Sequence, residues 1–466
     1  MSALSIFIIF STLIVSIYIS YQKFKDILNP FLILSCWWGG CALLANLSLT
    51  GINAPSLHTS ILVSMMILFF TLGGVVNIPW FKSKINIGIE REEIEEAEKI
   101  EEQRVKKILK IIFIIITPII FFYFFRALNI FYTQGIENYR MLVFGTKENP
   151  SILFRSGPIE LLYYLLIYSL IFYSLLASIA LYFQSNLHNN LQNNRKDGTL
   201  FYLLYAIFLS FLDAIMRLGR FNIYHALILV GLILIYKFRK EQTHKKNKKI
   251  KILVPALVLS IFILSMVGVG YFRDKDKKDL FSQFKIYLIE YHTVGFAIFD
   301  QELQDKNSYL QTHISYGRAT LGGVDQLVGL VARKIGFKNF SAPVQEIAFN
   351  MQTPRVIGNR GKAEFDCANS DCPIRYNAFS TILYTFYLDA RDFAFVIMPF
   401  ILGLLMAIFY RKMMEKKSIH STIMFLIIFF VIFFSIFQSQ IEAPATWLAV
   451  FINIFLLGKF KKKNLY

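Results

Sequence analysis

The sequence predicts an all-α polytopic membrane protein with about 11 transmembrane helices. Of its 466 residues, 55% are hydrophobic and only 17% are charged, whereas a soluble globular domain carries about 25% charged residues. The apolar residues gather in runs of about 17–25, long enough for a helix to cross roughly 30 Å of hydrocarbon. Because a backbone in lipid must satisfy its own hydrogen bonds, we expect these runs to form helices.

The elements follow from the apolar runs, taken in chain order. The predicted spans cover residues 3–20, 31–49, 59–80, 109–128, 159–183, 200–216, 221–236, 252–271, 393–410, 421–437 and 444–458. The charged stretch Glu90–Lys107 precedes the fourth span and is expected to extend it as one helix. Within that stretch, Glu102 and Lys106 lie one helical turn apart and can form an ion pair.

The positive charges in the loops set the orientation. Alternate loops on one side of the predicted membrane carry 28 Lys and Arg residues, whereas the short loops on the other side carry six. Since these residues favour the cytoplasmic side, the N-terminus is expected in the periplasm and the C-terminus in the cytoplasm, across a bacterial inner membrane. This topology explains the net charge of +18, so no nucleic-acid partner is expected.

Three parts result from this topology. Residues 1–271 hold transmembrane helices 1–8, residues 272–392 form a large periplasmic loop, and residues 393–466 hold helices 9–11 and a basic cytoplasmic tail. The loop is too long to be a simple connector, and we expect a mostly helical cap. Apolar residues at helical spacing stop at Gly336, which suits a helix C-cap; they are Leu321, Val324, Leu327, Val328, Val331 and Ile335. The apolar stretch Tyr376–Leu388 fits a position along the membrane surface.

Two cysteines in the long loop, Cys367 and Cys372, are separated by four residues. In an oxidising periplasm this spacing favours a local disulfide, with free thiols or a metal site as the alternatives. No nearby His completes a zinc set, so no metal site is predicted. The chain also lacks a P-loop, a GxGxxG sequence and an HExxH sequence, so no cofactor is expected.

Arginines occur at predicted outer helix ends, where cations are unfavourable. Arg217 and Arg220 lie in the short turn Met216-Arg217-Leu218-Gly219-Arg220-Phe221, and Arg273 follows the eighth span. A guanidinium group binds phosphate through two parallel hydrogen bonds, which suits the diphosphate of a lipid carrier. Snorkelling to lipid headgroups and pairing with Asp213, one helical turn away, are the alternatives for Arg217.

Three segments resemble the O-antigen polymerase family, the oligosaccharide repeat-unit polymerases called Wzy. Met216–Arg220 is similar to the arginine-bearing outer turn of the family, and Ser315–Leu321 to its Gly-containing loop segment. Tyr376–Asp389 is similar to the stretch that enters the span after the long loop. The family shows Asp-Phe-Gly at the end of that stretch, whereas this chain has Asp389-Ala390-Arg391-Asp392-Phe393, which leaves the role of Asp389 open.

The resemblance implies an inverting, metal-independent glycosyltransferase of the GT-C class. Such an enzyme joins undecaprenyl-diphosphate-linked oligosaccharide repeat units at the periplasmic face during lipopolysaccharide biosynthesis. It works among membrane lipids without a cofactor, with the chain-length regulator Wzz as its protein partner. An O-antigen ligase, which has a similar architecture, and a flippase for lipid-linked oligosaccharides are the alternatives.

The same interpretation assigns roles to residues. The diphosphate-binding candidates are Arg217, Arg220 and Arg273. The glycan-groove candidates are Arg318, Arg355, Arg360, Arg375 and Asn377. A base must also take the proton of the acceptor hydroxyl, and its candidates are His225, Glu290, Asp389 and Glu442. No spacing distinguishes among these four, so the sequence leaves the catalytic base open.

Overall fold

The structure is a computed structural model, and it describes residues 3–76, 91–144, 151–154, 157–189, 198–217, 220–241, 285–337, 342–351, 355–360, 372–376, 380–416 and 418–457. Among these residues, seven helices are long and apolar enough to cross a membrane. Three shorter apolar helices, Asn222–Lys237, Ile419–Phe434 and Pro444–Phe455, fall in further predicted spans. The prediction of an all-α polytopic membrane protein is therefore confirmed at this level.

The chain divides into two compact units. The first consists of Met1–Lys82, Ile263–Phe409 and Ile428–Thr446. The second consists of Ser83–Phe262, Tyr410–Ile427 and Trp447–Tyr466. Helices α16 (Ala394–Lys416), α17 (Ile419–Phe434) and α18 (Pro444–Leu457) each contribute residues to both units.

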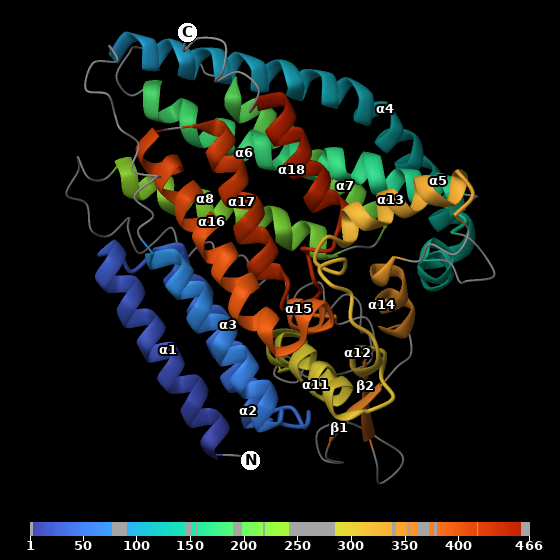
Figure 1. Cartoon of the computed structure of the whole chain (residues 1–466). Helices are drawn as coiled ribbons and strands as arrows, with labels where there is room; N and C mark the ends of the chain where they lie inside the picture. The colour runs from blue at the N-terminus through green and yellow to red at the C-terminus, as the bar shows by residue number, and fades with distance from the viewer. Residues whose placement is uncertain are drawn as a thin grey trace. The chain divides into compact units, whose positions relative to one another are not determined.

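The first unit begins with three long helices and continues with shorter elements of the long loop (Figure 1). The three long helices are α1 (Ala3–Phe24), α2 (Pro30–Leu47) and α3 (Leu57–Val75). The shorter elements are the π-helical turn Lys285–Glu290, α11 (Tyr291–Gln304), α12 (Tyr309–Thr312), α13 (Gly322–Lys334), α14 (Pro343–Met351), β1 (Arg355–Arg360), β2 (Cys372–Tyr376) and α15 (Ile382–Ala390). Local sequence fixes two helix starts. The Asn29 side chain accepts a hydrogen bond from the Leu32 backbone at 2.9 Å, and Ser56 accepts one from Thr59 at 3.3 Å.

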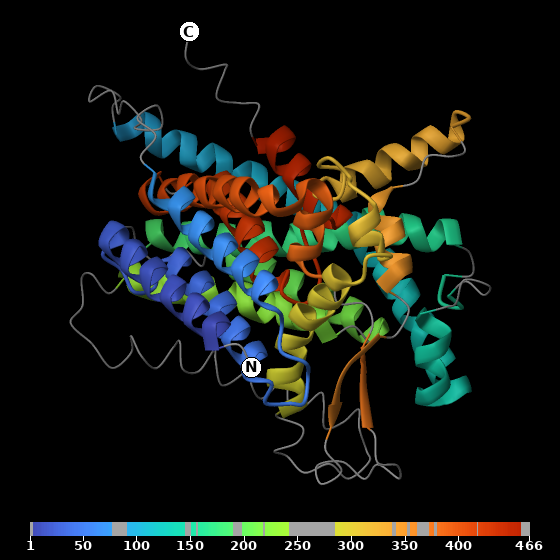
Figure 2. The ribbon, with the colours of Figure 1, turned by 60° about the horizontal axis from the view of Figure 1, so that its bottom comes forward.

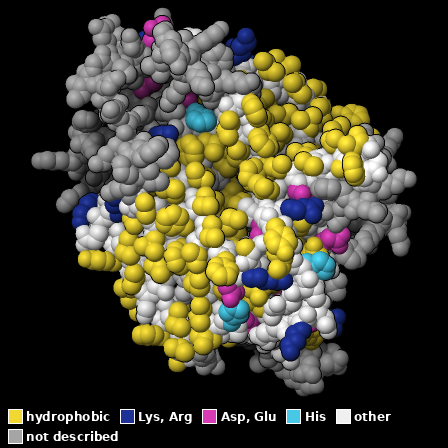
Figure 3. Space-filling view, viewed as in Figure 1, with side chains coloured by type: hydrophobic (Ala, Val, Ile, Leu, Met, Phe, Trp, Pro, Cys, Tyr) yellow, Lys and Arg dark blue, Asp and Glu magenta, His cyan; other side chains and the backbone are white. Residues whose placement is uncertain are grey.

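Helix α1 keeps large apolar side chains at the surface, as a lipid-facing helix should. The space-filling view shows hydrophobic side chains along it (Figure 3). They include Leu4, Phe7, Phe10, Ile14, Val15 and Tyr18. Helix α2, by contrast, is anchored inside the unit, because Trp37 and Trp38 donate through their indole nitrogens to the backbone oxygens of Phe433 and Ile432 at 3.0 and 2.9 Å.

Glycines allow α3 and α16 to pack backbone against backbone. A Cβ atom on Gly403 would overlap the carbonyl oxygen of Phe70, and one on Gly73 would overlap that of Phe400. Small residues permit this close approach between membrane helices, where dispersion contacts replace the hydrophobic driving force.

The described residues of the second unit include four long helices and two short helical segments. They are α4 (Arg91–Phe144), α5 (Gly157–Leu162), the π-helical turn Tyr163–Tyr168, α6 (Ser169–Asn189), α7 (Thr199–Met216) and α8 (Arg220–Glu241). Helix α4 confirms the predicted extension of the fourth span by a charged stretch, and Lys106 Nζ lies 2.5 Å from Glu102 Oε1. The helix continues beyond the predicted end of that span at residue 128 and is interrupted at Gly135, where φ is 73°.

In the long loop, one predicted helix is confirmed, and two features differ from the prediction. Helix α13 ends at Lys334 and is followed by Gly336 with φ of 107°, as the spacing predicted. Strands β1 and β2 pair in an antiparallel hairpin that the helical prediction missed (Figure 2). The proposed position of Tyr376–Leu388 along the membrane surface is wrong for its helical part. Every residue from Ile382 to Asp389 is buried in α15, because apolar residues cover all sides of this helix.

Several predicted features lie outside the described residues. They are the span at 252–271, Arg273, Cys367 and Asn377, so the disulfide between Cys367 and Cys372 stays a prediction. The proposed division at residues 271 and 392 also stays a prediction.

Candidate functional site

A buried guanidinium lies at the C-terminal end of α7. Arg217 follows the last residue of that helix, and its backbone N–H donates to the Asp213 carbonyl at 3.2 Å. Its side chain turns back and forms an ion pair with the Asp213 carboxylate, the pairing that the sequence analysis gave as an alternative to phosphate binding. Both residues are buried, with 9% of Arg217 and 1% of Asp213 exposed. A charge buried this deeply requires a partner, and each residue supplies one for the other.

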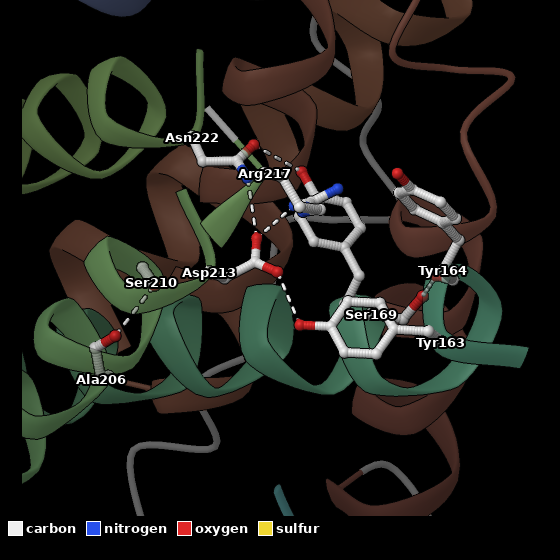
Figure 4. Close-up of polar contacts among 9 residues, drawn as sticks. Tyr163, Tyr164, Ser169, Ala206, Ser210, Asp213, Arg217 and Asn222 are labelled. Carbon is white, nitrogen blue, oxygen red and sulfur yellow. Dashed lines mark hydrogen bonds and ion pairs between the residues drawn. The ribbon is translucent and has the colours of Figure 1, made fainter. Parts of the chain in front are cut away.

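Two further side chains hold the carboxylate of Asp213 (Figure 4). The Tyr163 hydroxyl donates to Oδ1 at 2.7 Å, and Asn222 Nδ2 donates to Oδ2 at 2.9 Å. Tyr163 begins the π-helical turn that precedes α6, and Asn222 lies in the first turn of α8. Two elements other than α7 therefore fix the orientation of Asp213, and through it the position of Arg217.

Two tyrosine rings face the guanidinium of Arg217. Its Cζ atom lies 5.2 Å from the ring centre of Tyr164 and 4.6 Å from that of Tyr168. Such contacts are attractive because the ring face carries partial negative charge. Both tyrosines belong to the π-helical turn Tyr163–Tyr168, a rare geometry that is enriched at functional sites. Neither was among the site residues predicted from the sequence, although three tyrosines within one apolar run were a visible signal.

One hydrogen-bond donor of the Arg217 side chain has no partner among the described residues. This donor is the buried Nε atom. An unsatisfied buried donor typically costs about 1–3 kcal/mol, more for a charged group. Arg220, the second predicted diphosphate ligand, begins α8 three residues later. Among the described residues, the site therefore has one oriented guanidinium whose buried Nε donor is unpaired.

A small pocket adjoins Asp213. It is lined by Tyr168, Ile171, Phe172, Leu175, Ser210, Asp213, Asn222 and His225. Polar side chains of α7 and α8 thus meet apolar side chains of α6. His225, a predicted acid–base candidate, therefore lines the same pocket as Asp213, the ion-pair partner of Arg217.

The other acid–base candidates lie in the first unit. Glu442 is buried, and its Oε2 atom accepts a hydrogen bond from the Thr385 hydroxyl at 3.2 Å. Burial raises the pKa of Glu442 to about 8, and the charge of Asp389 acts in the same direction. Glu290 is also buried and accepts a hydrogen bond from the Tyr376 hydroxyl at 2.5 Å.

Asp389 holds the turn before α13 together. Its carboxylate accepts hydrogen bonds from the hydroxyl of Ser315 and from the backbone N–H groups of Gly317, Ala319 and Thr320, the last three at 2.8–3.0 Å. Gly317 has φ of 89°, a conformation that favours glycine. This geometry gives Asp389 a structural role in joining the two segments, Ser315–Leu321 and Tyr376–Asp389, that carry the family resemblance.

The predicted groove arginines do not form one cluster of free cations. Arg318 pairs with Asp325 at 3.0 Å, and Arg355 pairs with buried Glu302 at 2.6 Å. Burial raises the pKa of Glu302, and the charge of Arg355 opposes that shift. On the hairpin, Arg355 and Arg360 lie at the two ends of β1, and Arg375 is exposed on β2.

No protein-family model matches this chain, and comparisons with curated proteins and with solved structures gave no significant match. Among the described residues, no group of three or more His, Cys, Asp and Glu side chains is placed to hold a metal ion.

Proposed function

We propose that the protein is an O-antigen polymerase, which joins undecaprenyl-diphosphate-linked oligosaccharide repeat units at the periplasmic face of the bacterial inner membrane. One observation carries the proposal: the buried guanidinium of Arg217 faces two tyrosine rings at the end of an apolar helix and has an unpaired Nε donor. A lipid-linked diphosphate combines an anionic headgroup with a hydrocarbon tail. The end of a membrane helix suits both parts of that substrate.

The proposed transfer requires the protein to stabilise the leaving diphosphate and to accept the proton of the acceptor hydroxyl. The acceptor hydroxyl oxygen forms a bond to the anomeric carbon, and the bond from that carbon to the diphosphate oxygen breaks, with its electron pair leaving on the diphosphate. Arg217 stabilises the charge that develops on this leaving group, because its position is fixed before reaction by Asp213. The hydroxyl proton passes to a base, and His225 is the candidate that lies in the pocket beside Asp213.

The first test separates a role in binding phosphate from a role in neutralising Asp213. A strain lacking the gene is complemented with the wild type, with Arg217→Gln, with Asp213→Asn, or with the double variant Asp213→Asn/Arg217→Gln. Membrane expression is measured for each, and lipopolysaccharide is analysed on gels. The double variant replaces the ion pair by a neutral pair of similar size. It therefore leaves no unpaired buried charge.

We expect Arg217→Gln and the double variant to show core and core-plus-one-unit bands only, because loss of one charge-stabilising donor lowers a rate by about 100-fold or more. Asp213→Asn keeps Arg217 and an acceptor oxygen for it but loses the charge that fixes its position, so a weakened ladder is expected. As a control, Arg126→Ala removes a cation that donates to the Ile152 carbonyl at 2.7 Å elsewhere in the unit, and it should keep the ladder.

A full ladder from the double variant would contradict the phosphate role, because Arg217 would then serve only to neutralise Asp213. The knockout itself separates the alternatives. Accumulation of core with a single repeat unit is expected for a polymerase. Complete loss of capped core would instead favour a ligase or a flippase.

A further inference from the structure

Helix α13 carries a row of exposed apolar side chains. Val328 and Val331, with Ile335 directly after the last residue of α13, are 51%, 62% and 69% exposed, and they follow one another at spacings of three and four residues. This spacing places them on one side of the helix. Leu321 before the helix and Phe337 after it are also exposed, and we call these five residues the α13 stripe. In Figure 3 hydrophobic side chains gather where α13 runs.

The opposite side of α13 faces the protein. Gly329 is buried, and Asp325 is largely covered and pairs with Arg318. The helix is therefore amphipathic, with its polar and packed side turned toward the first unit and its apolar side turned away. The described residues leave the stripe uncovered, although it is as apolar as a buried helix face.

The N-terminus of α13 is fixed to the start of α18. A Cβ atom on Gly323 would lie 2.7 Å from Pro444 Cα and 2.9 Å from the carbonyl oxygen of Ala443. A Cβ atom on Gly322 would lie 3.0 Å from Glu442 Cβ. Only glycine permits this approach. Pro444 is the first residue of α18, an apolar helix that the sequence predicts to span the membrane.

This anchor sets the depth of α13. A spanning helix begins near the boundary between hydrocarbon and headgroups, so α13 starts at that boundary. Its 13 residues extend about 20 Å from there. An amphipathic helix at this depth is stable when its apolar side enters the boundary region of the lipid and its polar side does not.

We propose that α13 is an interfacial helix, and that the α13 stripe inserts into the lipid of the same bilayer that the apolar helices cross. The stripe is then covered by acyl chains rather than by another protein. This inference is independent of the polymerase proposal, because any polytopic protein with this geometry would bring the same surface to the membrane.

The test measures what touches the stripe in the full-length protein. All four native cysteines are replaced by serine, and a single nitroxide label is attached at Val331→Cys or, separately, at Val328→Cys. The protein is reconstituted into vesicles of phosphatidylethanolamine and phosphatidylglycerol. Paramagnetic resonance then compares collisions with oxygen, which concentrates in lipid, and with nickel ethylenediaminediacetate, which stays in water.

Three labelled positions serve as references. Phe10→Cys lies on the exposed side of α1 and reports a lipid environment, whereas exposed Asn307→Cys lies in the turn between α11 and α12 and reports water. Gln326→Cys is on the same helix as Val331, five residues earlier and thus on a different side. Elution in gel filtration, compared with that of the cysteine-free parent, shows that each variant is folded.

We expect labels at Val331 and Val328 to collide several-fold more with oxygen than with the nickel reagent, as at Phe10, and the label at Gln326 to show a lower ratio. A ratio like that of Asn307 would overturn the proposal, because the stripe would then face water. Low collision rates with both reagents would overturn it as well, because protein would then cover the stripe.

Discussion

At the scale of single residues, Glu442 is a carboxyl group whose proton affinity depends on folding. It lies in the connection before α18, accepts a hydrogen bond from Thr385, and is 6% exposed. Burial, with the nearby charge of Asp389, raises its pKa from 4.5 to about 8. The folded protein thus binds this proton more tightly than the unfolded chain does.

The sign of the resulting pH dependence follows from linkage. The stability that Glu442 contributes is fully present below pH 4.5 and is lost as the pH rises to about 8. We predict that Glu442→Gln, which stays neutral, will be more stable than the wild type above pH 7, by on the order of a few kcal/mol. The measurement is the thermal unfolding midpoint of the purified protein in detergent between pH 5 and pH 9.

The matched control for Glu442→Gln is Glu96→Gln, since Glu96 is exposed on α4. The control should leave the pH dependence of the midpoint as in the wild type. If Glu442→Gln did the same, the buried carboxyl would not determine the pH dependence.

Residue pairs close in sequence were predictable, whereas the residues around them were not. The pairing of Asp213 with Arg217 follows from helical spacing alone. Tyr163 and Asn222, which also hold Asp213, lie 50 and nine positions away and arrive through the packing of other helices. Spacing within one helix does not contain that information.

At the scale of elements, the contact between α3 and α16 depends on glycine. We predict that Gly403→Ala will destabilise the protein by about 1–3 kcal/mol, because the added methyl group overlaps the Phe70 carbonyl oxygen and forces the helices apart. The measurement is the thermal midpoint in detergent. Gly40→Ala is the control, since a Cβ atom on Gly40 of α2 has no atom within 4 Å. Equal midpoints for the two variants would contradict the predicted clash.

Elements with a strong periodic pattern were predicted well. The charged stretch that continues into α4 and the helix that ends before Gly336 both follow from residues local to the element. The hairpin of β1 and β2 depends on pairing between strands that are separated in sequence, so local pattern did not reveal it. Helix α15 was misplaced because apolar sequence alone does not distinguish a buried helix from one on a membrane surface.

At the scale of the whole molecule, the orientation in the membrane is a prediction from charge. The ratio of 28 Lys and Arg residues to six between the two sets of loops predicts a periplasmic N-terminus. We predict that Asn53→Cys, in the exposed part of the connection between α2 and α3, will react with a membrane-impermeant maleimide in intact spheroplasts. The cysteine-free protein is the parent for this variant.

A cytoplasmic reference completes that experiment. Glu96→Cys on α4 should react only after the spheroplasts are permeabilised, because its loop belongs to the positively charged set. The reverse pattern for the two cysteines would invert the topology and would remove the periplasmic site from the proposed function.

The sequence by itself determined the class of this protein: apolar runs of membrane-spanning length form helices, because a helix satisfies every backbone hydrogen bond within one such run. It also determined the charged extension of α4, and it offered the pairing of Asp213 with Arg217 as one alternative, since both depend on residues close in sequence. Only the tertiary structure decided which side chains surround Arg217, that α15 is buried, and that Glu442 lies beside the first turn of α13. These features depend on contacts between distant segments, and a helix does not specify its neighbours through its own periodicity.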